Sequence, residues 1–114
     1  KYQDAIKDLN LSIELDSTDA FAYSCRGSSK TLLGDYAGAV EDCNKAITLD
    51  PKDVWAYQIR ASAKENLGDY AGALHDCSKI IEIDPENSAG AYSSRGSIKN
   101  NLEDYKGGGF QKSN

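Results

Sequence analysis

The 114-residue sequence contains no Met, only two Pro and one His, and no long apolar run. No stretch approaches the roughly 18 apolar residues that a membrane-spanning helix needs, so no membrane partner is expected. No basic-then-apolar leader opens the chain, so no signal peptide is visible. The scarcity of Pro and the 39% content of apolar residues fit a soluble and mostly helical protein.

An excess of basic charge is also lacking, because the formal net charge is −5 and the 13 Lys and Arg residues are scattered. Nucleic-acid phosphates need a dense basic face, so no nucleic-acid partner is expected. The three cysteines, Cys25, Cys43 and Cys77, form an odd set without a CxxC pair. We expect small core thiols rather than disulfides or zinc ligands, which weakly favours a cytoplasmic location.

The residues of a catalytic site are lacking as well. The single histidine, His75, stands beside Asp76 on the expected outer face of a helix, and no triad, dyad or metal cluster can be built on it. The glycine run 107–109 lacks the Lys-Ser/Thr of a phosphate loop. We therefore predict no catalytic residue, no metal ligand and no cofactor, and the chain is not expected to be an enzyme.

What the sequence does contain is an internal repeat. Residues 33–39 read Leu-Gly-Asp-Tyr-Ala-Gly-Ala, and the same seven letters return at residues 67–73. A period of about 34 residues is typical of stacked repeat architectures. Four tyrosines mark the period: Tyr2, Tyr36, Tyr70 and Tyr105.

Each unit is expected to contain two helices. After the first three tyrosines, apolar residues at helical spacing, such as Ala39, Val40 and Cys43, predict a trailing helix of roughly 14 residues. The trailing helices should stop before Pro51 and Pro85, because proline disfavours helix at the preceding residue.

A leading helix precedes each of the last three tyrosines. These helices are expected to start near Asp19, Asp53 and Ser88, whose side chains are suitable N-caps. A small residue, such as Gly27 in the first leading helix, is expected to face Ala39 and to allow the two helices of a unit to approach closely.

This unit resembles the tetratricopeptide repeat. The matching letters are the aromatic at Tyr23, the small residue at Gly27, the Gly-Asp-Tyr turn, Ala39 and Pro51, and they recur through almost the whole chain. The resemblance implies an all-α, antiparallel helix-pair solenoid that winds into a right-handed superhelix. We predict one array: residues 1–17 as the trailing helix of a partial repeat, 18–51 and 52–87 as repeats, and 88–114 as a degenerate or truncated repeat.

The leading helices carry regular basic residues at Arg26, Arg60 and Arg95, each followed four residues later by Lys. A buried charge without a partner is very costly, so acidic partners are expected. We predict a structural ladder between neighbouring repeats, although a direct ligand role for the basic residues is the alternative. The predicted pairs are Asp8–Arg26, Asp42–Arg60 and Asp76–Arg95.

The resemblance implies that the leading helices line a concave face, where a protein or peptide partner binds. Aromatic side chains such as Phe21 and Trp55 are favoured anchors on a rigid surface. The alternatives are that Trp55 only packs against its neighbours and that the polar lining is simply solvated. The predicted partner-binding residues are Phe21, Ser24, Ser28, Trp55, Gln58, Ile59, Ser62, Asn66, Ser93 and Ser97.

Some members of the family hold the acidic C-terminus of chaperones with a clamp of Lys, Asn and Arg. Here the corresponding positions hold residues such as Ser24, Ser28, Ile59 and Ser93, so a partner with a carboxylate tail is not expected. The predicted function is a protein-interaction scaffold that holds an extended peptide or helix in the concave groove. The alternative is a structural module that forms homo-oligomers through uncapped repeat ends, or a piece of a longer array.

Overall fold

The computed structural model describes residues 1–104, and within this range every regular element is a helix, with no strand. The prediction of an all-α fold is therefore confirmed. Residues 105–114 of the predicted degenerate or truncated repeat 88–114 lie outside the described residues. The elements are α1 (Tyr2–Leu15), α2 (Ala20–Leu32), α3 (Tyr36–Leu49), α4 (Val54–Asn66), α5 (Tyr70–Ile83), the short 3₁₀-helix η1 (Pro85–Asn87) and α6 (Ala89–Glu103).

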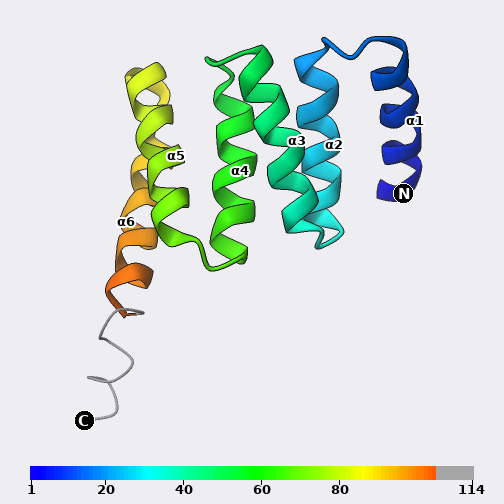
Figure 1. The fold of residues 1–114 in the computed structure, drawn as a ribbon. Helices are drawn as coiled ribbons and strands as arrows, with labels where there is room; N and C mark the ends of the chain where they lie inside the picture. The colour runs from blue at the N-terminus through cyan, green and yellow to red at the C-terminus, as the bar shows by residue number, and fades with distance from the viewer. Residues whose placement is uncertain (105–114) are drawn as a thin grey trace.

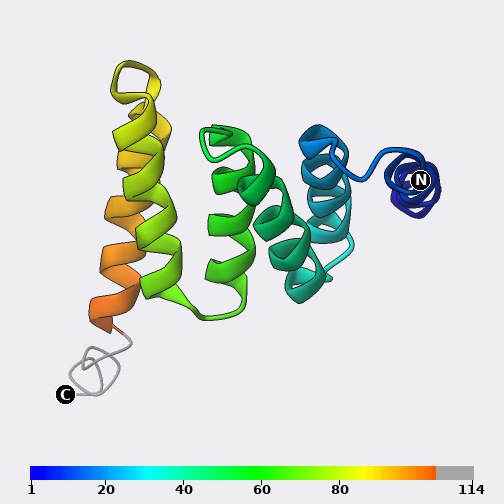
Figure 2. The same ribbon diagram turned by 45° about the horizontal axis from the view of Figure 1, so that its top comes forward.

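The helices form a row with successive helices antiparallel, which runs from α1 at one end to α5 and α6, overlapping in both views, at the other (Figures 1 and 2). The most extensive contacts join α2 to α3 and α4 to α5, which form two helical hairpins. The leading helix α2 also contacts the leading helix α4. The trailing helices α1, α3 and α5 each contain 14 residues, as their periodicity predicts.

The helix boundaries follow from local chemistry. The carboxylate of Asp19 accepts the amide hydrogens of Phe21 and Ala22, and that of Asp53 accepts the amide hydrogen of Ala56. The predicted N-caps of α2 and α4 are therefore confirmed. The trailing helices α3 and α5 end before the two prolines, also as predicted.

The predicted capping role of Ser88 is wrong. Its hydroxyl donates to the carbonyl oxygen of Pro85 at 2.8 Å, and no side-chain bond caps α6. The step from Tyr57 to Tyr92 is one residue longer than that from Tyr23 to Tyr57, and the extra residue lies in the region of η1. The hydroxyl of Ser88 donates to a carbonyl oxygen of this 3₁₀ turn instead of accepting a helix amide hydrogen.

The turn within each hairpin requires glycine. Gly34 and Gly68 have φ angles of 88° and 84°, a conformation that side chains rarely adopt. The next residue in each turn, Asp35 or Asp69, caps the trailing helix by accepting an amide hydrogen three residues later. The repeated Gly-Asp pair thus ends one helix and starts the next.

The helices of the first hairpin approach closely where small residues meet. A Cβ atom placed on Gly27 would lie 3.1 Å from Cys43 Sγ and 3.3 Å from the carbonyl oxygen of Ala39. This contact confirms that a small residue faces Ala39. Cys43 and Cys77 are buried free thiols, as expected, and Cys25 is partly buried.

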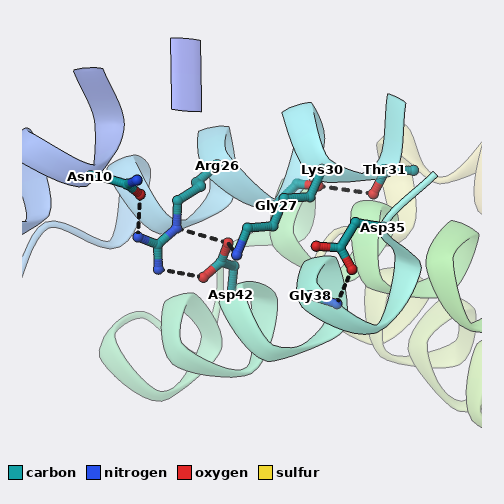
Figure 3. A network of polar contacts seen from close by, with 8 residues as sticks. All are labelled: Asn10, Arg26, Gly27, Lys30, Thr31, Asp35, Gly38 and Asp42. Carbon is teal, nitrogen blue, oxygen red and sulfur yellow. Dashed lines mark hydrogen bonds and ion pairs between the residues drawn. The ribbon is translucent and has the colours of Figure 1, made fainter. Parts of the chain in front are cut away.

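The predicted partners in the charged ladder are wrong. The pairs Asp8–Arg26, Asp42–Arg60 and Asp76–Arg95 do not form. Instead, Arg26 Nε and Nη2 donate to the two carboxylate oxygens of Asp42 at 2.9 and 2.7 Å (Figure 3). Each bond therefore lies within a hairpin.

The second hairpin repeats the same arrangement. Arg60 donates to both carboxylate oxygens of Asp76 at 3.0 and 2.7 Å, and Lys64 Nζ lies 3.9 Å from that carboxylate. The physical reason is that Asp76 projects into the closely packed interface of its own hairpin, where it is fully buried. A carboxylate there needs its cations nearby.

Contact between neighbouring units is made by the remaining nitrogen of each guanidinium. Nη1 of Arg26 donates to Asn10 Oδ1 on α1, and Nη1 of Arg60 donates to Asn44 Oδ1 on α3, both at 2.8 Å. The ladder therefore does join repeats, but through amide side chains that sequence reasoning missed. Asp8, two residues before Asn10, is exposed.

Candidate functional site: a groove along the leading helices

A pocket with a volume of about 340 Å³ lies between α4 and α6. We call it the α4–α6 pocket. The trailing helix α5 contributes apolar residues, and polar residues of α4 and α6 complete the wall. The lining residues are Gln58, Ala61, Ser62, Glu65, Cys77, Ile80, Gly90, Ala91, Ser94 and Ile98.

This pocket exists because α6 has small residues where the earlier leading helices have large ones. Gly90 occupies the repeat position of Phe21 and Trp55, and Ser94 occupies that of Cys25 in α2 and of the larger Ile59 in α4. A Cβ atom on Gly90 would meet no atom within 4 Å. The wall is therefore open at this point.

A second pocket of about 230 Å³ lies between α2 and α4, and we call it the α2–α4 pocket. It shares Gln58 and Ser62 with the α4–α6 pocket, so the two pockets adjoin across α4. Together they form what we call the leading-helix groove. The lining of the α2–α4 pocket is Ser28, Thr31, Leu32, Trp55, Gln58, Ile59 and Ser62.

Phe21 and Trp55 form an aromatic pair at the α2–α4 pocket. The rings of Phe21 and Trp55 lie 5.6 Å apart between centroids, with planes tilted by 37°. Phe21 is 65% exposed and Trp55 37% exposed, which leaves apolar surface available to a partner. Trp55 therefore both packs against a neighbouring aromatic and lines a pocket.

The groove carries little charge. Glu65 is the one charged residue that lines either pocket, and neither lining contains Lys, Arg or His. The basic residues Arg26, Lys30, Arg60 and Lys64 instead bind the buried carboxylates. The groove thus combines apolar side chains with uncharged hydroxyl and amide groups.

The structure brings half of the predicted binding residues together. Five of the ten line the pockets: Ser28, Trp55, Gln58, Ile59 and Ser62. Phe21 packs against Trp55 but lines neither pocket. The role of these side chains in binding stays a prediction.

The other four predicted residues lie elsewhere. Ser24 is fully buried and its hydroxyl donates to Asp53 Oδ2 at 3.2 Å, so it holds two leading helices together. Asn66 donates to the backbone carbonyl of Ser62. Ser93 and Ser97 are exposed on α6 and line neither pocket. The interpretation of Ser24 as part of an open surface was wrong.

Sequence reasoning missed the contribution of the trailing helix. Cys77 and Ile80 of α5 line the α4–α6 pocket, although Cys77 was expected only as a core thiol. The available signal was Gly90, because a glycine at a position otherwise held by aromatics uncovers whatever lies behind it. Glu65 was missed since it stands near the helix end, next to the ladder residue Lys64.

No cluster of potential metal ligands accompanies the groove in residues 1–104. These residues contain no group of three or more His, Cys, Asp or Glu side chains placed to hold a metal ion. His75 is exposed on α5, as its position in the sequence predicts. Within the same residues, no helix is long and apolar enough to cross a bilayer.

Comparison with known proteins agrees with this geometry. Models of the tetratricopeptide repeat match residues 20–53 and 43–75. The TPR2B domain of yeast Sti1, solved in complex with pHsp70, is 33% identical over 87% of this chain and 78% of that one, with a TM-score of 0.72. The chain belongs to the tetratricopeptide-repeat (TPR) family. Its hairpins are therefore TPR hairpins, and the family resemblance is confirmed.

Two further TPR structures superpose more closely. The first TPR domain of human RPAP3 is 26% identical, covers 93% of this chain and 83% of that one, and has a TM-score of 0.89. The first TPR of Spaghetti (RPAP3), bound to the HSP90 peptide SRMEEVD, is 27% identical over 90% and 83%, with a TM-score of 0.86. Among curated protein sequences, none matches this chain.

Proposed function

We propose that this TPR chain is a protein-interaction scaffold that binds an extended peptide of a partner protein along the leading-helix groove. The observation that carries the proposal is the pair of adjoining pockets, about 340 and 230 Å³ in volume, that share Gln58 and Ser62. Apolar pockets with a few polar groups are typical of binding sites. The peptide complexes of the Sti1 and Spaghetti domains support this use of the fold.

The lining favours a peptide with uncharged side chains. An apolar side chain fits the α4–α6 pocket, where Ile80 and Ile98 replace its contact with water. Gln58 and Ser62 offer hydrogen bonds to the peptide backbone, and Phe21 with Trp55 provides an aromatic anchor.

A carboxylate-tailed peptide is a poor fit for this groove. The peptide bound by the Spaghetti domain, SRMEEVD, is rich in acids. Here a peptide carboxylate would meet Glu65 and no cation among the lining residues. Like charges repel and a desolvated carboxylate without a partner is costly. We therefore propose a partner segment of different chemistry.

The proposed role is binding without catalysis, and the proposed location is the cytoplasm. The free thiols of Cys43 and Cys77 favour a reducing compartment, because cytosolic proteins keep their cysteines reduced.

The test is to select 12-residue peptides from a displayed random library and to titrate the selected peptides into the protein. Trp55 is the single tryptophan and lies in the groove, so its fluorescence reports binding. Gly90→Leu should weaken binding by roughly tenfold or more, because the new side chain fills the α4–α6 pocket. The open space at Gly90 allows this change without strain.

The matched control is Gly96→Ala, on the same helix but outside both pockets. It should leave the affinity unchanged. Equal affinities for the wild type and the Gly90→Leu variant would contradict the proposal. Selection of peptides that bind only through a free C-terminal carboxylate would contradict the proposed chemistry.

A further inference from the structure

Glu65 gives the α4–α6 pocket a negative charge that the rest of the groove lacks. The same repeat position holds Thr31 in α2 and Asn100 in α6, neither of which is charged. The hydroxyl of Thr31 already donates to the carbonyl oxygen of Gly27 at 2.9 Å (Figure 3). Among the leading helices, a carboxylate at this position is therefore a property of α4 alone.

The carboxylate of Glu65 has no partner within residues 1–104. The ion pairs between residues of this range involve the carboxylates of Asp42, Asp76 and Glu82 but not that of Glu65. No side chain of this range donates a hydrogen bond to it either. Because Glu65 is half-buried, its carboxylate gives up part of its hydration without gaining a bond in return. Such a group favours a ligand that brings its own hydrogen-bond donor.

The charge of Glu65 acts on the interior of the pocket. Burial raises the pKa of the Cys77 thiol, the charges of Asp76 and Glu65 raise it further, and Arg95 opposes them with the smallest effect. Cys77 lines the same pocket from α5. The charge of Asp76 is compensated by the guanidinium of Arg60, so Glu65 supplies the uncompensated negative charge of this pocket.

The rest of the pocket suits a long apolar stem. Cys77, Ile80 and Ile98 are buried side chains that form an apolar floor. The wall on α6 is open at Gly90, where an added Cβ would meet no atom within 4 Å. The side chains of Lys and Arg bury their methylene stems along apolar surface and keep the charged end at a polar rim. A floor of this kind with Glu65 at its edge matches that division.

We propose that the α4–α6 pocket binds one basic side chain of the partner peptide, with the stem on Ile80 and Ile98 and the cation paired with Glu65. This proposal rests on the proposed function and names the side chain that the pocket selects. The peptide is otherwise uncharged, as the remaining lining favours. Arginine is preferred over lysine, because a guanidinium can donate two parallel hydrogen bonds to one carboxylate. Arg26 binds Asp42 in this way within the first hairpin (Figure 3).

Other side chains use only part of the pocket. A purely apolar side chain fits the floor but removes water from Glu65 without replacing its hydrogen bonds. An acidic side chain adds repulsion to that cost. A neutral donor satisfies the carboxylate, but hydrogen bonds between charged groups are about twice as strong. A basic side chain therefore gains from both the floor and the carboxylate.

The first test uses two small probes that differ in charge but have nearly the same shape, n-butylguanidinium and n-butylurea. Each is titrated into isotope-labelled protein, and the amide shifts of Ser62, Gly90 and Ser94 report binding in the pocket. The wild type should bind n-butylguanidinium about tenfold more tightly than n-butylurea. Glu65→Gln should bind the two probes equally. This change keeps the size of a side chain that has no partner to lose, so the fold should be retained.

The matched control is Glu41→Gln, which removes the same charge from an exposed site on α3 outside both pockets. It should keep the preference of the wild type, and circular dichroism confirms that both variants are folded. Equal binding of the probes to the wild type, no binding of either probe at the pocket, or a preference that survives in Glu65→Gln would each overturn the proposal.

The second test returns to the peptide library. Peptides selected on the wild type should share Arg or Lys at one position, whereas selection on Glu65→Lys should favour Asp or Glu there. Replacing the shared Arg by citrulline, its uncharged analogue, should weaken binding about tenfold for the wild type but not for Glu65→Gln.

The outcomes separate this proposal from the proposed function. Peptides that lack a basic residue, yet bind more weakly to Gly90→Leu, would overturn the basic side chain and leave the groove as the binding site. A library that yields no binder would count against the proposed function, whereas the titration of n-butylguanidinium would still decide whether the pocket and Glu65 select a cation.

Discussion

The buried aspartates Asp42 and Asp76 show how single residues hold the hairpins together. Each carboxylate accepts two hydrogen bonds from an arginine and lies near a lysine. The hydrogen bond to Asp42 raises the pKa of Arg26. Burial is the largest single effect on Arg60 and would lower its pKa, but the hydrogen bond to Asp76 and the negative charge of that carboxylate, with smaller contributions from Tyr57 and Cys43, together raise it.

Removing one of these carboxylates should be strongly destabilising. Asp76→Ala leaves Arg60 and Lys64 partly buried without a partner, so we expect a loss of about 3 kcal/mol in the free energy of unfolding. Asp8→Ala changes the exposed equivalent in α1 and should cost less than about 0.5 kcal/mol in dilute protein. Urea denaturation followed by circular dichroism measures both, and equal losses would contradict this explanation.

The thiol of Cys43 makes a pH-dependent contribution to the free energy of unfolding. Burial raises its pKa to about 12, whereas an unfolded thiol titrates near about 8.5. Between these values the unfolded state binds fewer protons than the folded state, so stability falls as the pH rises. Below the unfolded pKa this contribution is fully present.

We therefore expect the wild type to lose about 1 kcal/mol more stability than Cys43→Ala between pH 9 and 10. Urea denaturation of both proteins at the two pH values provides the measurement. Tyr and Lys titrate in both proteins, so their effect drops out of the difference in stability. Parallel changes in the two proteins would show that the buried thiol does not titrate in this way.

At this scale the sequence predicted residue types better than partners. Regular Arg and Asp positions predicted buried charge pairs, and these exist. Asp42 could pair with the arginine of its own hairpin or with that of the next one, and a repeating sequence satisfies either pairing equally well. The outcome depends on which face of the trailing helix carries Asp42. The amide contacts of Asn10 and Asn44 were missed because these residues are exposed and uncharged.

At the scale of elements, the Gly-Asp turn determines how each trailing helix begins. Asp35 accepts the amide hydrogen of Gly38 at 3.0 Å, and a Cβ on Gly38 would clash with that carboxylate. Gly38→Ala should therefore displace the cap and cost about 1 kcal/mol, even though Ala favours helix.

The matched change is Gly96→Ala, where the same substitution meets open space. It should raise stability by up to about 1 kcal/mol through helix propensity alone. Thermal unfolding of dilute protein compares the two. A gain of stability in both variants would mean that the Asp35 cap contributes nothing.

Helix boundaries were the most predictable feature of the elements. Asp19, Asp53 and the two prolines act through neighbours in sequence, so local chemistry decides the result. The exception is Ser88, where the 3₁₀ turn at Pro85–Asn87 offered its hydroxyl another acceptor. Whether the hydroxyl caps the helix or binds another acceptor depends on the path of the loop, which the sequence pattern does not predict.

At the scale of the whole molecule, stability should decrease from the centre of the row to its ends. The helix α4 has five buried residues, whereas α6 has two and α1 has none. In a repeat array each element is supported by its neighbours only. We expect amide hydrogen exchange in dilute protein to be slowest in α3 and α4 and fastest in α1 and α6. Uniform protection along the row would contradict this gradient.

The groove itself was only partly predictable. The family resemblance pointed to the leading helices, and Trp55, Gln58 and Ser62 do line the pockets. The depth of the α4–α6 pocket could not be read from one helix, because it depends on the spacing of α4 and α6 and on Ile80 behind them. Ser24 lay on the predicted face, yet its bond to Asp53 removes it from the surface.

The central claim is that a partner peptide occupies the leading-helix groove. The most direct measurement is the change in backbone amide chemical shifts when a library-selected peptide is added to isotope-labelled protein. We predict the largest changes at Gln58, Ser62 and Gly90, together with the indole N–H of Trp55. Changes confined to the outer faces of α3 and α5, around residues such as His75, would contradict it.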